Sequence, residues 1–190
     1  VRTGFLEEGQ LADMLAHLPD HIKPMLEIAY VTGWRRGELL SRCWQHVDLG
    51  AGWIRLEPGE TKNDEGRQFP IIPRLRRVLE DQHARKVQLE REQGRIISAL
   101  FFDDRGRAVT KGQLTHIWIR ARTLAGHPGL LLHDCRRSAA RNLIRSGVAQ
   151  RVAMELTGHL TASIFQRYAI VSEDQLSQAG EQLSALYGTR

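Results

Sequence analysis

Apolar residues recur at helical spacing over most of the chain. Leucine and methionine positions over residues 11–18 predict one helix, and an apolar stretch over residues 22–30 predicts a second helix that ends at Thr32-Gly33. The stretch RRGELLSRC, which begins at Arg35, predicts a third helix. The N-terminal part of the chain is therefore expected to be helical.

After Trp44 the pattern changes to short apolar runs separated by polar turns. Residues 53–56 and 68–72 are two strand-like runs on either side of polar residues with glycines, which predicts a hairpin. The run ALFFD, residues 99–103, predicts one more short strand. Together these segments predict one small antiparallel sheet.

Helical periodicity returns after the hairpin. Pro73 suits the first turn of a long charged helix over residues 74–92, and Thr110 with Gln113 forms the capping box of another helix. Further helices are predicted over residues 134–146, over residues 149–156, just before residue 168 and after residue 172. The expected fold is α+β, mostly helical with a small antiparallel sheet.

Composition places the chain among ordinary globular domains. Its 190 residues suit one domain, 42% of them are hydrophobic, and the formal net charge is +5. Cys43 and Cys135 form no CxxC pair, which argues against a disulfide framework or a thiolate zinc site and fits a reducing compartment, so the expected location is cytoplasmic. No apolar run is long enough to span a bilayer, so no membrane partner is expected.

The positive charge is concentrated in one part of the chain. Residues 120–151 contain seven arginines and a single acid, Asp134. Within them, HDCRR places His133, Arg136 and Arg137 in the first turn of a predicted helix, where the helix dipole disfavours cations. A bound anion would reverse that cost, because free backbone N–H groups and guanidinium groups would converge on it. Taken alone, the motif is more often a solvated basic helix face with a capping histidine.

A second arginine motif also lies at a predicted helix start. In TGWRRGELL, Arg35 follows the break at Thr32-Gly33, and Glu38 lies one turn later, where it can fix the Arg35 guanidinium. Taken alone, this pair is an ordinary surface salt bridge.

The two motifs belong to a longer series, in a fixed order along the chain. The series is Thr32-Gly33-x-Arg35-x-Gly37-Glu38-Leu39, then Lys62 in the predicted hairpin, then His133-x-x-Arg136, then Gly158-His159, then Tyr168. This series resembles the catalytic domain of the tyrosine recombinases, the phage-integrase family, and the resemblance covers nearly the whole chain.

The resemblance implies a role for each of these residues. Arg35, Lys62, His133, Arg136 and His159 would surround a scissile DNA phosphate, and Tyr168 would be the nucleophile. Lys62 would protonate the leaving 5′ oxygen, His133 would accept the tyrosine proton or hold the phosphate, and His159 would donate a hydrogen bond to it. Glu38 would orient Arg35, whereas Arg36, Arg137 and Arg141 would contact the DNA backbone or lie on the surface.

Some positions depart from the family pattern or compete with the assigned nucleophile. Many relatives have histidine where this chain has Ile170, and a bulky apolar residue is commoner at the position of Cys135, a thiol that would make the site sensitive to oxidation. Among the other tyrosines, Tyr30 lies in an apolar helix and is expected in the core, and Tyr187 is near the chain end. Tyr168 is therefore the expected nucleophile.

The expected function is a site-specific DNA recombinase, an integrase of a phage or mobile element, that forms a 3′-phosphotyrosine without a metal or nucleotide cofactor. The alternatives are a type IB topoisomerase-like enzyme and a catalytically silent DNA-binding module. A metal-dependent nuclease fits less well, because no carboxylates cluster beside His133 or His159. The expected partners are double-stranded DNA, further copies of the chain in a tetramer, and accessory DNA-bending proteins.

The resemblance also implies a domain organisation. Residues 1–171 would form the catalytic domain, and residues 172–190 a C-terminal amphipathic helix and tail whose apolar stripe is buried either on its own domain or on a neighbouring protomer. The resemblance favours exchange between protomers. Family members carry a separate N-terminal domain that grips DNA, and residues 1–20 cannot supply it, so the chain is expected to be a fragment.

Overall fold

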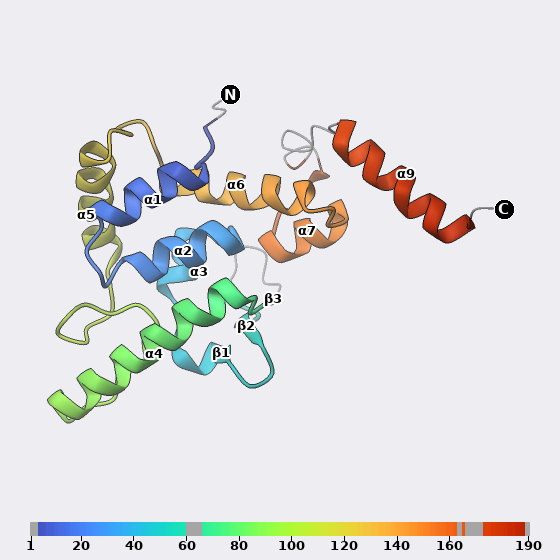
Figure 1. The fold of residues 1–190 in the computed structure, drawn as a ribbon. Coiled ribbons are helices and arrows are strands. Elements are labelled where there is room, and N and C mark those ends of the chain that lie inside the picture. Colours follow the sequence, from blue (N-terminus) through green and yellow to red (C-terminus); the bar gives the residue numbers. More distant parts are fainter. Residues whose placement is uncertain (1–3, 60–65, 163–164, 166–172, 189–190) are drawn as a thin grey trace.

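The helices pack around a central helix, and a small sheet lies to one side (Figure 1). The computed structural model describes residues 4–59, 66–162, 165 and 173–188. The elements, in chain order, are α1 (Glu8–His17), α2 (Lys23–Thr32), α3 (Arg36–Leu40), the 3-10 helix η1 (Trp44–His46), β1 (Val47–Asp48), β2 (Trp53–Leu56), β3 (Arg67–Pro70), α4 (Pro73–Gln93), α5 (Lys111–Leu124), α6 (Leu132–Arg145), α7 (Gln150–Thr157) and α9 (Glu173–Tyr187). The mostly helical α+β fold predicted from the sequence is confirmed.

The sheet is antiparallel, in the order β1-β2-β3, and the predicted hairpin is its β2–β3 pair. In this pair Ile54 lies opposite Phe69 and Leu56 lies opposite Arg67. The strand predicted over residues 99–103 is wrong: the segment is buried but makes only isolated bridges, from Ala99 to Cys43 and from Phe102 to Ala108. Its pairing partner changes within three residues, so no ladder forms.

Local sequence signals set most helix ends. Pro73 begins α4, and Gly94 ends it in the left-handed conformation. The predicted capping box at the start of α5 is present, with Thr110 Oγ1 accepting from the Gln113 backbone N–H at 3.3 Å. The helix predicted from Arg35 is shorter than expected, because α3 ends at Leu40.

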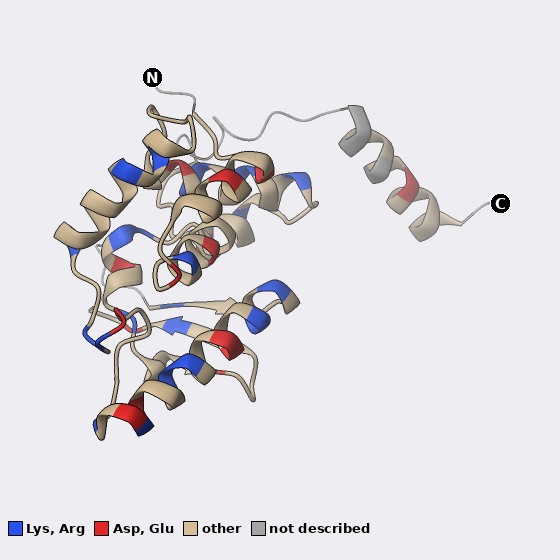
Figure 2. Cartoon of the chain, turned by 60° about the vertical axis from the view of Figure 1, so that its left-hand side comes forward, with Lys and Arg blue, Asp and Glu red and all other residues tan. Residues whose placement is uncertain are grey.

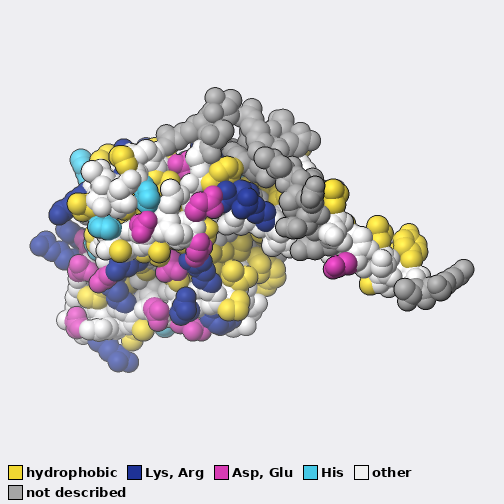
Figure 3. Space-filling view, turned by 45° about the horizontal axis from the view of Figure 1, so that its top comes forward, with side chains coloured by type: hydrophobic (Ala, Val, Ile, Leu, Met, Phe, Trp, Pro, Cys, Tyr) yellow, Lys and Arg dark blue, Asp and Glu magenta, His cyan; other side chains and the backbone are white. Residues whose placement is uncertain are grey.

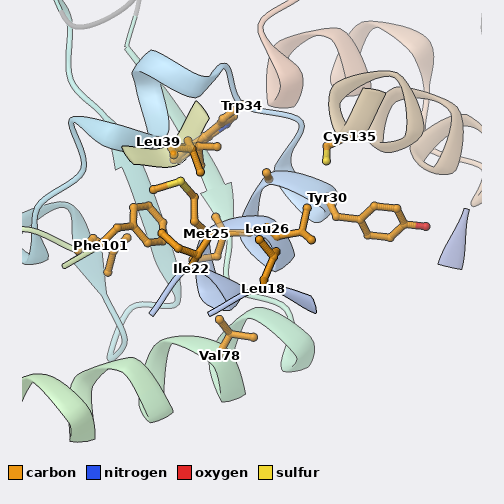
Figure 4. Close-up of a cluster of buried hydrophobic side chains, with 14 of the residues drawn as sticks. Leu18, Ile22, Met25, Leu26, Tyr30, Trp34, Leu39, Val78, Phe101 and Cys135 are labelled. Atoms are coloured by element: carbon orange, nitrogen blue, oxygen red, sulfur yellow. The ribbon is translucent and has the colours of Figure 1, made fainter. Parts of the chain in front are cut away.

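The main core surrounds α2, which packs against α6 on one side and α4 on the other (Figure 1). Figure 4 shows Met25 and Leu26 of α2 among the side chains of this core, with Val78 reaching it from α4. A smaller cluster, Ala140, Ala153 and Phe165, joins α6 and α7 to the segment that contains Phe165. This packing places the start of α6 beside the end of α2.

Helix α9 projects away from the other helices (Figure 1). Its side chains Leu176, Leu183 and Leu186 are 64%, 53% and 75% exposed, so the described residues do not cover them. Figure 3 shows apolar side chains exposed along this helix, and in Figure 2 its described residues include no lysine or arginine, whereas α4 carries several. Among the described residues, no helix has the length and apolar character needed to cross a membrane.

Candidate active site

The first part of the site lies where α2 ends and α3 begins. Gly33 ends α2 with φ of 66°, and a Cβ at this position would lie 2.9 Å from the Cβ of Ala139 on α6. Glycine is therefore needed here both for the backbone conformation and for the close approach of α6. This approach brings the start of α3 to the side of α6 that carries Arg136.

Arg35 and Glu38 form the predicted pair across the first turn of α3. Glu38 accepts the Arg35 backbone N–H at 2.7 Å and the Arg35 Nη1 at 2.8 Å. The Glu38 side chain is only 4% exposed. Burial by itself raises the pKa of Glu38, but the Arg35 N–H and the charge of Arg67 hold that pKa below its ordinary value, so the carboxylate stays ionised.

The second part of the site is the start of α6. His133 lies at the exposed first turn, and Arg136 lies one turn further on, buried under the ends of α2 and α7. Arg136 Nη1 donates to the carbonyl of Gly33 at 2.8 Å and also to the carbonyl of Thr157. Arg136 therefore connects the ends of two helices.

The C-terminal end of α7 is the point at which the site converges. The carbonyl oxygen of Gly158 accepts a hydrogen bond from Arg35 Nη2 at 3.1 Å and another from Arg136 Nη2 at 2.8 Å. Two arginines from distant parts of the chain thus share one carbonyl. The last carbonyls of a helix carry partial negative charge, which stabilises cations placed there.

Arg67, the first residue of β3, joins the same group, although the sequence did not identify it. Its Nη1 donates to the carbonyl of Thr157 at 2.9 Å, and its Nη2 contacts the Glu38 carboxylate. In the structure Arg67 and Phe69 share the inward face of β3, on either side of the exposed Gln68. The strand predicted from the sequence begins at residue 68, one residue after Arg67.

Both histidines of the site are held neutral. Partial desolvation by the surrounding protein atoms, followed by the charges of Arg136 and Arg137, lowers the pKa of His133 although part of its side chain stays exposed. Burial, together with the Arg136 and Arg35 guanidinium groups, lowers the pKa of His159 to about 3. Each imidazole is therefore uncharged at neutral pH.

A hydrogen bond also sets the tautomer of His159. The Thr157 hydroxyl donates to the carbonyl of Ala153 at 2.7 Å and lies 2.7 Å from His159 Nδ1. A hydroxyl has one proton to donate, so when that proton goes to the Ala153 carbonyl, Nδ1 is the protonated nitrogen and donates to Thr157. In that arrangement Nε2 is the proton-accepting nitrogen of His159.

Two hollows flank the arginine group. One, of about 470 Å³, is lined by Arg35, His133 and Arg136 together with Trp34 and Trp118. The other, of about 870 Å³, is an open groove lined by residues that include Arg67, Gly158 and His159. The cationic side chains thus border space that a large polyanion can approach.

The three remaining predicted arginines lie outside this group. Arg36 donates to Thr115 Oγ1 of α5 at 3.3 Å, and Arg137 donates to Asp134 at 2.9 Å. Arg141 is 8% exposed and makes two hydrogen bonds, of 2.6 and 2.7 Å, to the Glu7 carboxylate. The prediction that Arg141 is a surface or DNA-contacting residue therefore needs correction: its guanidinium is used inside the domain.

The structure leaves part of the predicted site undescribed and clarifies other candidates. Lys62 and Tyr168 lie outside the described residues, and of the helix predicted just before Tyr168 only residues 162 and 165 are described, both helical. Tyr30 is in the core, as predicted, with an exposed fraction of 7%. Cys135 is buried, and burial raises the pKa of its thiol, so the predicted sensitivity to oxidation is not supported.

Comparisons with known proteins agree with this arrangement. Residues 4–175 match the model of the phage integrase family. The chain is 24% identical to the integrase of Salmonella phage P22 over 99% of this chain and 49% of that protein. It is 32% identical to the tyrosine recombinase XerC of Herpetosiphon aurantiacus over 80% of this chain and 49% of that protein. The chain spans about half the length of the curated relatives it matches.

Solved structures show the same fold. A crystal structure of XerA recombinase superposes with a TM-score of 0.72 at 17% identity, covering 100% of this chain and 67% of that one. A lambda integrase dimer bound to a COC′ core site superposes with a TM-score of 0.67 at 22% identity, covering 88% of this chain and 48% of that one. With the family model matching most of its length, the chain belongs to the phage integrase family.

Proposed function

We propose that this chain is the catalytic part of a site-specific DNA recombinase that cleaves and rejoins DNA through a 3′-phosphotyrosine. The main support is the meeting of Arg35 and Arg136 at the carbonyl of Gly158. Two guanidinium groups at one point are suited to the two non-bridging oxygens of a phosphodiester. The names of the relatives, integrase and tyrosine recombinase, agree with this chemistry.

The reaction is a transfer between two oxygen atoms. The Tyr168 oxygen attacks phosphorus, the bond from phosphorus to the 5′ oxygen breaks, and the phenol proton passes to His133. Lys62 supplies a proton to the departing 5′ oxygen. A 5′-hydroxyl of another strand then attacks the phosphotyrosine and releases Tyr168, so the phosphodiester energy is retained in the covalent intermediate and no nucleotide is consumed.

The arginines supply the stabilisation that this transfer needs. A free phenol with a pKa of about 10 is only about 0.1% ionised at pH 7, so it is a weak nucleophile. Negative charge on the phosphate oxygens rises in the transition state, and Arg35 and Arg136 stabilise it most strongly when they are already oriented. In this proposal, phosphate oxygens replace the carbonyl of Gly158 as the acceptors of these two side chains.

His159 completes the phosphate site in a way that depends on its tautomer. With Nδ1 protonated, Nε2 can donate to a phosphate only after it takes up a proton. The negative charge of a bound phosphodiester favours that uptake, because it opposes the effect of the neighbouring arginines. We therefore propose that His159 becomes a cation when DNA binds and then donates to a non-bridging oxygen.

The proposed partner is double-stranded DNA carrying a specific recombination site. The lambda integrase structure is that of a dimer on a core site, and a Tn1549 transposon integrase is described in complex with circular intermediate DNA. We propose that this chain also assembles on DNA, as a tetramer, with accessory DNA-bending proteins. The uncovered apolar stripe of α9 supports a contact with a neighbouring protomer.

A covalent trapping experiment tests the proposed function. Nicked duplexes with a randomised centre are incubated with the chain, and DNA that stays attached in a denaturing gel is sequenced to define the cleavage site. We expect an adduct through Tyr168 at the 3′ phosphate of the cut strand. Tyr168→Phe should bind the same duplex but form no adduct, because only the attacking oxygen is removed.

Three outcomes would contradict the proposal in different ways. Adduct formation by Tyr168→Phe at the wild-type yield would exclude Tyr168 as the nucleophile. Relaxation of supercoiled DNA without strand exchange between two sites would favour topoisomerase-like chemistry. DNA binding without any adduct, on any duplex, would leave only a silent DNA-binding module.

A further inference from the structure

Arg67 is a buried cation in the centre of the site to which the proposed reaction gives no role. It begins β3, and its side chain is 7% exposed, so it points into the domain with Phe69 and away from solvent. The neighbouring residue of the strand, Gln68, points outward. A buried guanidinium is costly unless most of its donors have partners, so its contacts indicate its purpose.

The partners of Arg67 are the groups that hold Arg35 and Arg136. Its Nη2 contacts the Glu38 carboxylate, which also accepts from Arg35, and its Nη1 donates to the carbonyl of Thr157, which also accepts from Arg136. Each contact of Arg67 is thus shared with a different arginine of the phosphate site. Arg67 therefore stabilises the positions of Arg35 and Arg136 through shared partners, without a hydrogen bond to either arginine.

Gly158 allows this arrangement. A Cβ at Gly158 would lie 1.4 Å from Arg67 Nη1 and 2.3 Å from its Cζ, so only glycine lets the guanidinium lie against the backbone here. The left-handed φ of 70° at this residue also favours glycine. The backbone that leads to His159 therefore rests directly on Arg67.

We propose that Arg67 is a positioning residue: it fixes the Glu38 carboxylate and the end of α7, and thereby sets the orientation of Arg35 and His159. This inference rests on the proposed recombinase function. Arg67 does not itself contact the phosphate, because the phosphate is proposed to take the place of the Gly158 carbonyl, to which Arg35 and Arg136 donate, whereas Arg67 donates to Thr157 and Glu38 instead. Lysine cannot replace it fully, since one ammonium group does not reproduce the fork that spans two acceptors.

The kinetic test uses Arg67→Met, which keeps the length of the side chain but removes its charge and donors. On a nicked duplex that the wild-type chain cleaves, we expect single-turnover adduct formation to slow by about 10- to 100-fold, as for other groups that orient reacting residues. The dissociation constant for the duplex should change by less than about threefold, because no phosphate contact is removed. Arg55→Met, on the neighbouring strand and 38% exposed, is the matched control.

A double-mutant cycle separates positioning from a general loss of structure. Because Arg67 acts partly through Arg35, adding Arg67→Met to Arg35→Ala should slow cleavage by a smaller factor than Arg67→Met slows the wild-type chain. Multiplied effects in the double variant would overturn the proposal. Wild-type cleavage by Arg67→Met would do the same, and an equal loss of rate and DNA affinity would make Arg67 a phosphate ligand instead.

Two further measurements keep the test decisive. If Arg67→Met does not fold, Arg67→Lys is measured instead. We expect it to slow cleavage by about tenfold, because one ammonium group keeps only one of the two contacts, with the Glu38 carboxylate or with the Thr157 carbonyl. The His159 ring resonances of the free protein need no DNA: Arg67→Met should shift them, and unchanged resonances would overturn the proposal. A wild-type chain that forms no adduct would therefore refute the proposed function without deciding the role of Arg67.

Discussion

At the scale of single residues, the site consists of charged side chains whose ordinary partners are backbone groups. Arg35 and Arg136 come from segments about a hundred positions apart, yet both donate to the carbonyl of Gly158. Glu38, almost fully buried, keeps Arg35 pointed at that carbonyl. The orientation of the arginines is therefore set before any DNA arrives, which is the condition for strong electrostatic catalysis.

Removing either arginine should affect chemistry more than affinity. We expect Arg35→Ala and Arg136→Ala to slow adduct formation by about 10²- to 10³-fold, because their contacts strengthen as charge develops on the phosphate. The affinity for the duplex should fall much less. Gel measurement of adduct rates beside fluorescence anisotropy with the same duplex compares the two quantities, and equal losses would identify these residues as backbone clamps only.

The neutral histidines predict how stability depends on pH. The folded-state pKa of His159 is about 3, and that of His133 is also lowered, whereas the ordinary value is 6.5. The unfolded chain thus binds protons that the folded chain does not, so stability is full above about pH 6.5 and falls as the pH decreases toward 3.

Urea unfolding at pH 7.5 and at pH 5 measures this effect. We expect a lower free energy of unfolding at pH 5, and a smaller pH dependence in His159→Gln. Carboxylates whose pKa is lowered, such as Glu38, contribute mainly below the ordinary value of 4.5, so the histidines dominate this pH range. Equal stabilities of the wild-type chain at the two pH values would contradict the burial of neutral His159.

At the scale of elements, α6 is held from two sides. One side carries His133 and Arg136, and along the other runs the N-terminal strap, residues 5–7. Leu6 donates its backbone N–H to Ser138 Oγ at 2.8 Å, and Glu7 pairs with Arg141. The strap therefore anchors the helix that supplies two residues of the site.

The strap gives Arg141 a role that can be distinguished from DNA contact. Arg141→Met removes the pair with Glu7 and the contact of the guanidinium with the Phe5 ring, whose centroid lies 4.2 Å from Cζ. Because the Glu7 side chain is 56% exposed, we expect a loss of only about 1 kcal/mol, or a decrease in Tm of about 2–4 °C. Thermal unfolding measures this change.

DNA binding by the same variant provides the contrast. The slope of log affinity against log salt should be unchanged in Arg141→Met, because no phosphate contact is removed. A slope smaller by about 1 would restore Arg141 to the DNA-contacting surface and contradict its internal role.

Sequence patterns predicted elements better than they predicted the site. Thr110 and Gln113 specify the start of α5 locally, so that prediction is confirmed. The strand predicted over residues 99–103 was wrong because strand pairing depends on partners elsewhere in the chain.

Arg67 was missed for a similar reason: its contacts with Glu38 and Thr157 exist only after β3, α3 and α7 have packed together. Arg141 was misjudged because its partner Glu7 is more than a hundred positions away.

At the scale of the whole molecule, the main body and α9 behave differently. The body buries its apolar residues around α2, whereas α9 presents Leu176, Leu183 and Leu186 to solvent (Figures 1 and 3). An apolar stripe of this kind is stable when a second surface covers it. Docking of these described side chains on their own domain is not observed, and we propose that a neighbouring protomer covers them.

Truncation tests the role of α9. A fragment that ends at Val171 should unfold at nearly the same temperature as the full chain, because the stripe contributes little to the core. We expect it to form the covalent adduct but not to assemble two duplexes into one complex. Sedimentation and native gels with the cleaved duplex measure assembly. Assembly as in the full chain would reduce α9 to a local element, and an unfolded fragment would assign it to the core.

Because three arginines of the site are bound to the carbonyls and the carboxylate near the end of α7, DNA association and DNA cleavage should respond differently to ionic strength. Arg35, Arg67 and Arg136 already have protein partners there and are partly or fully buried, so few counterions surround them in the free protein. Counterion release on DNA binding must come from exposed lysines and arginines elsewhere on the body, some of which Figure 3 shows at the surface. Added salt should therefore weaken association steeply while leaving the cleavage rate of the bound complex almost constant, since buried charges are screened little.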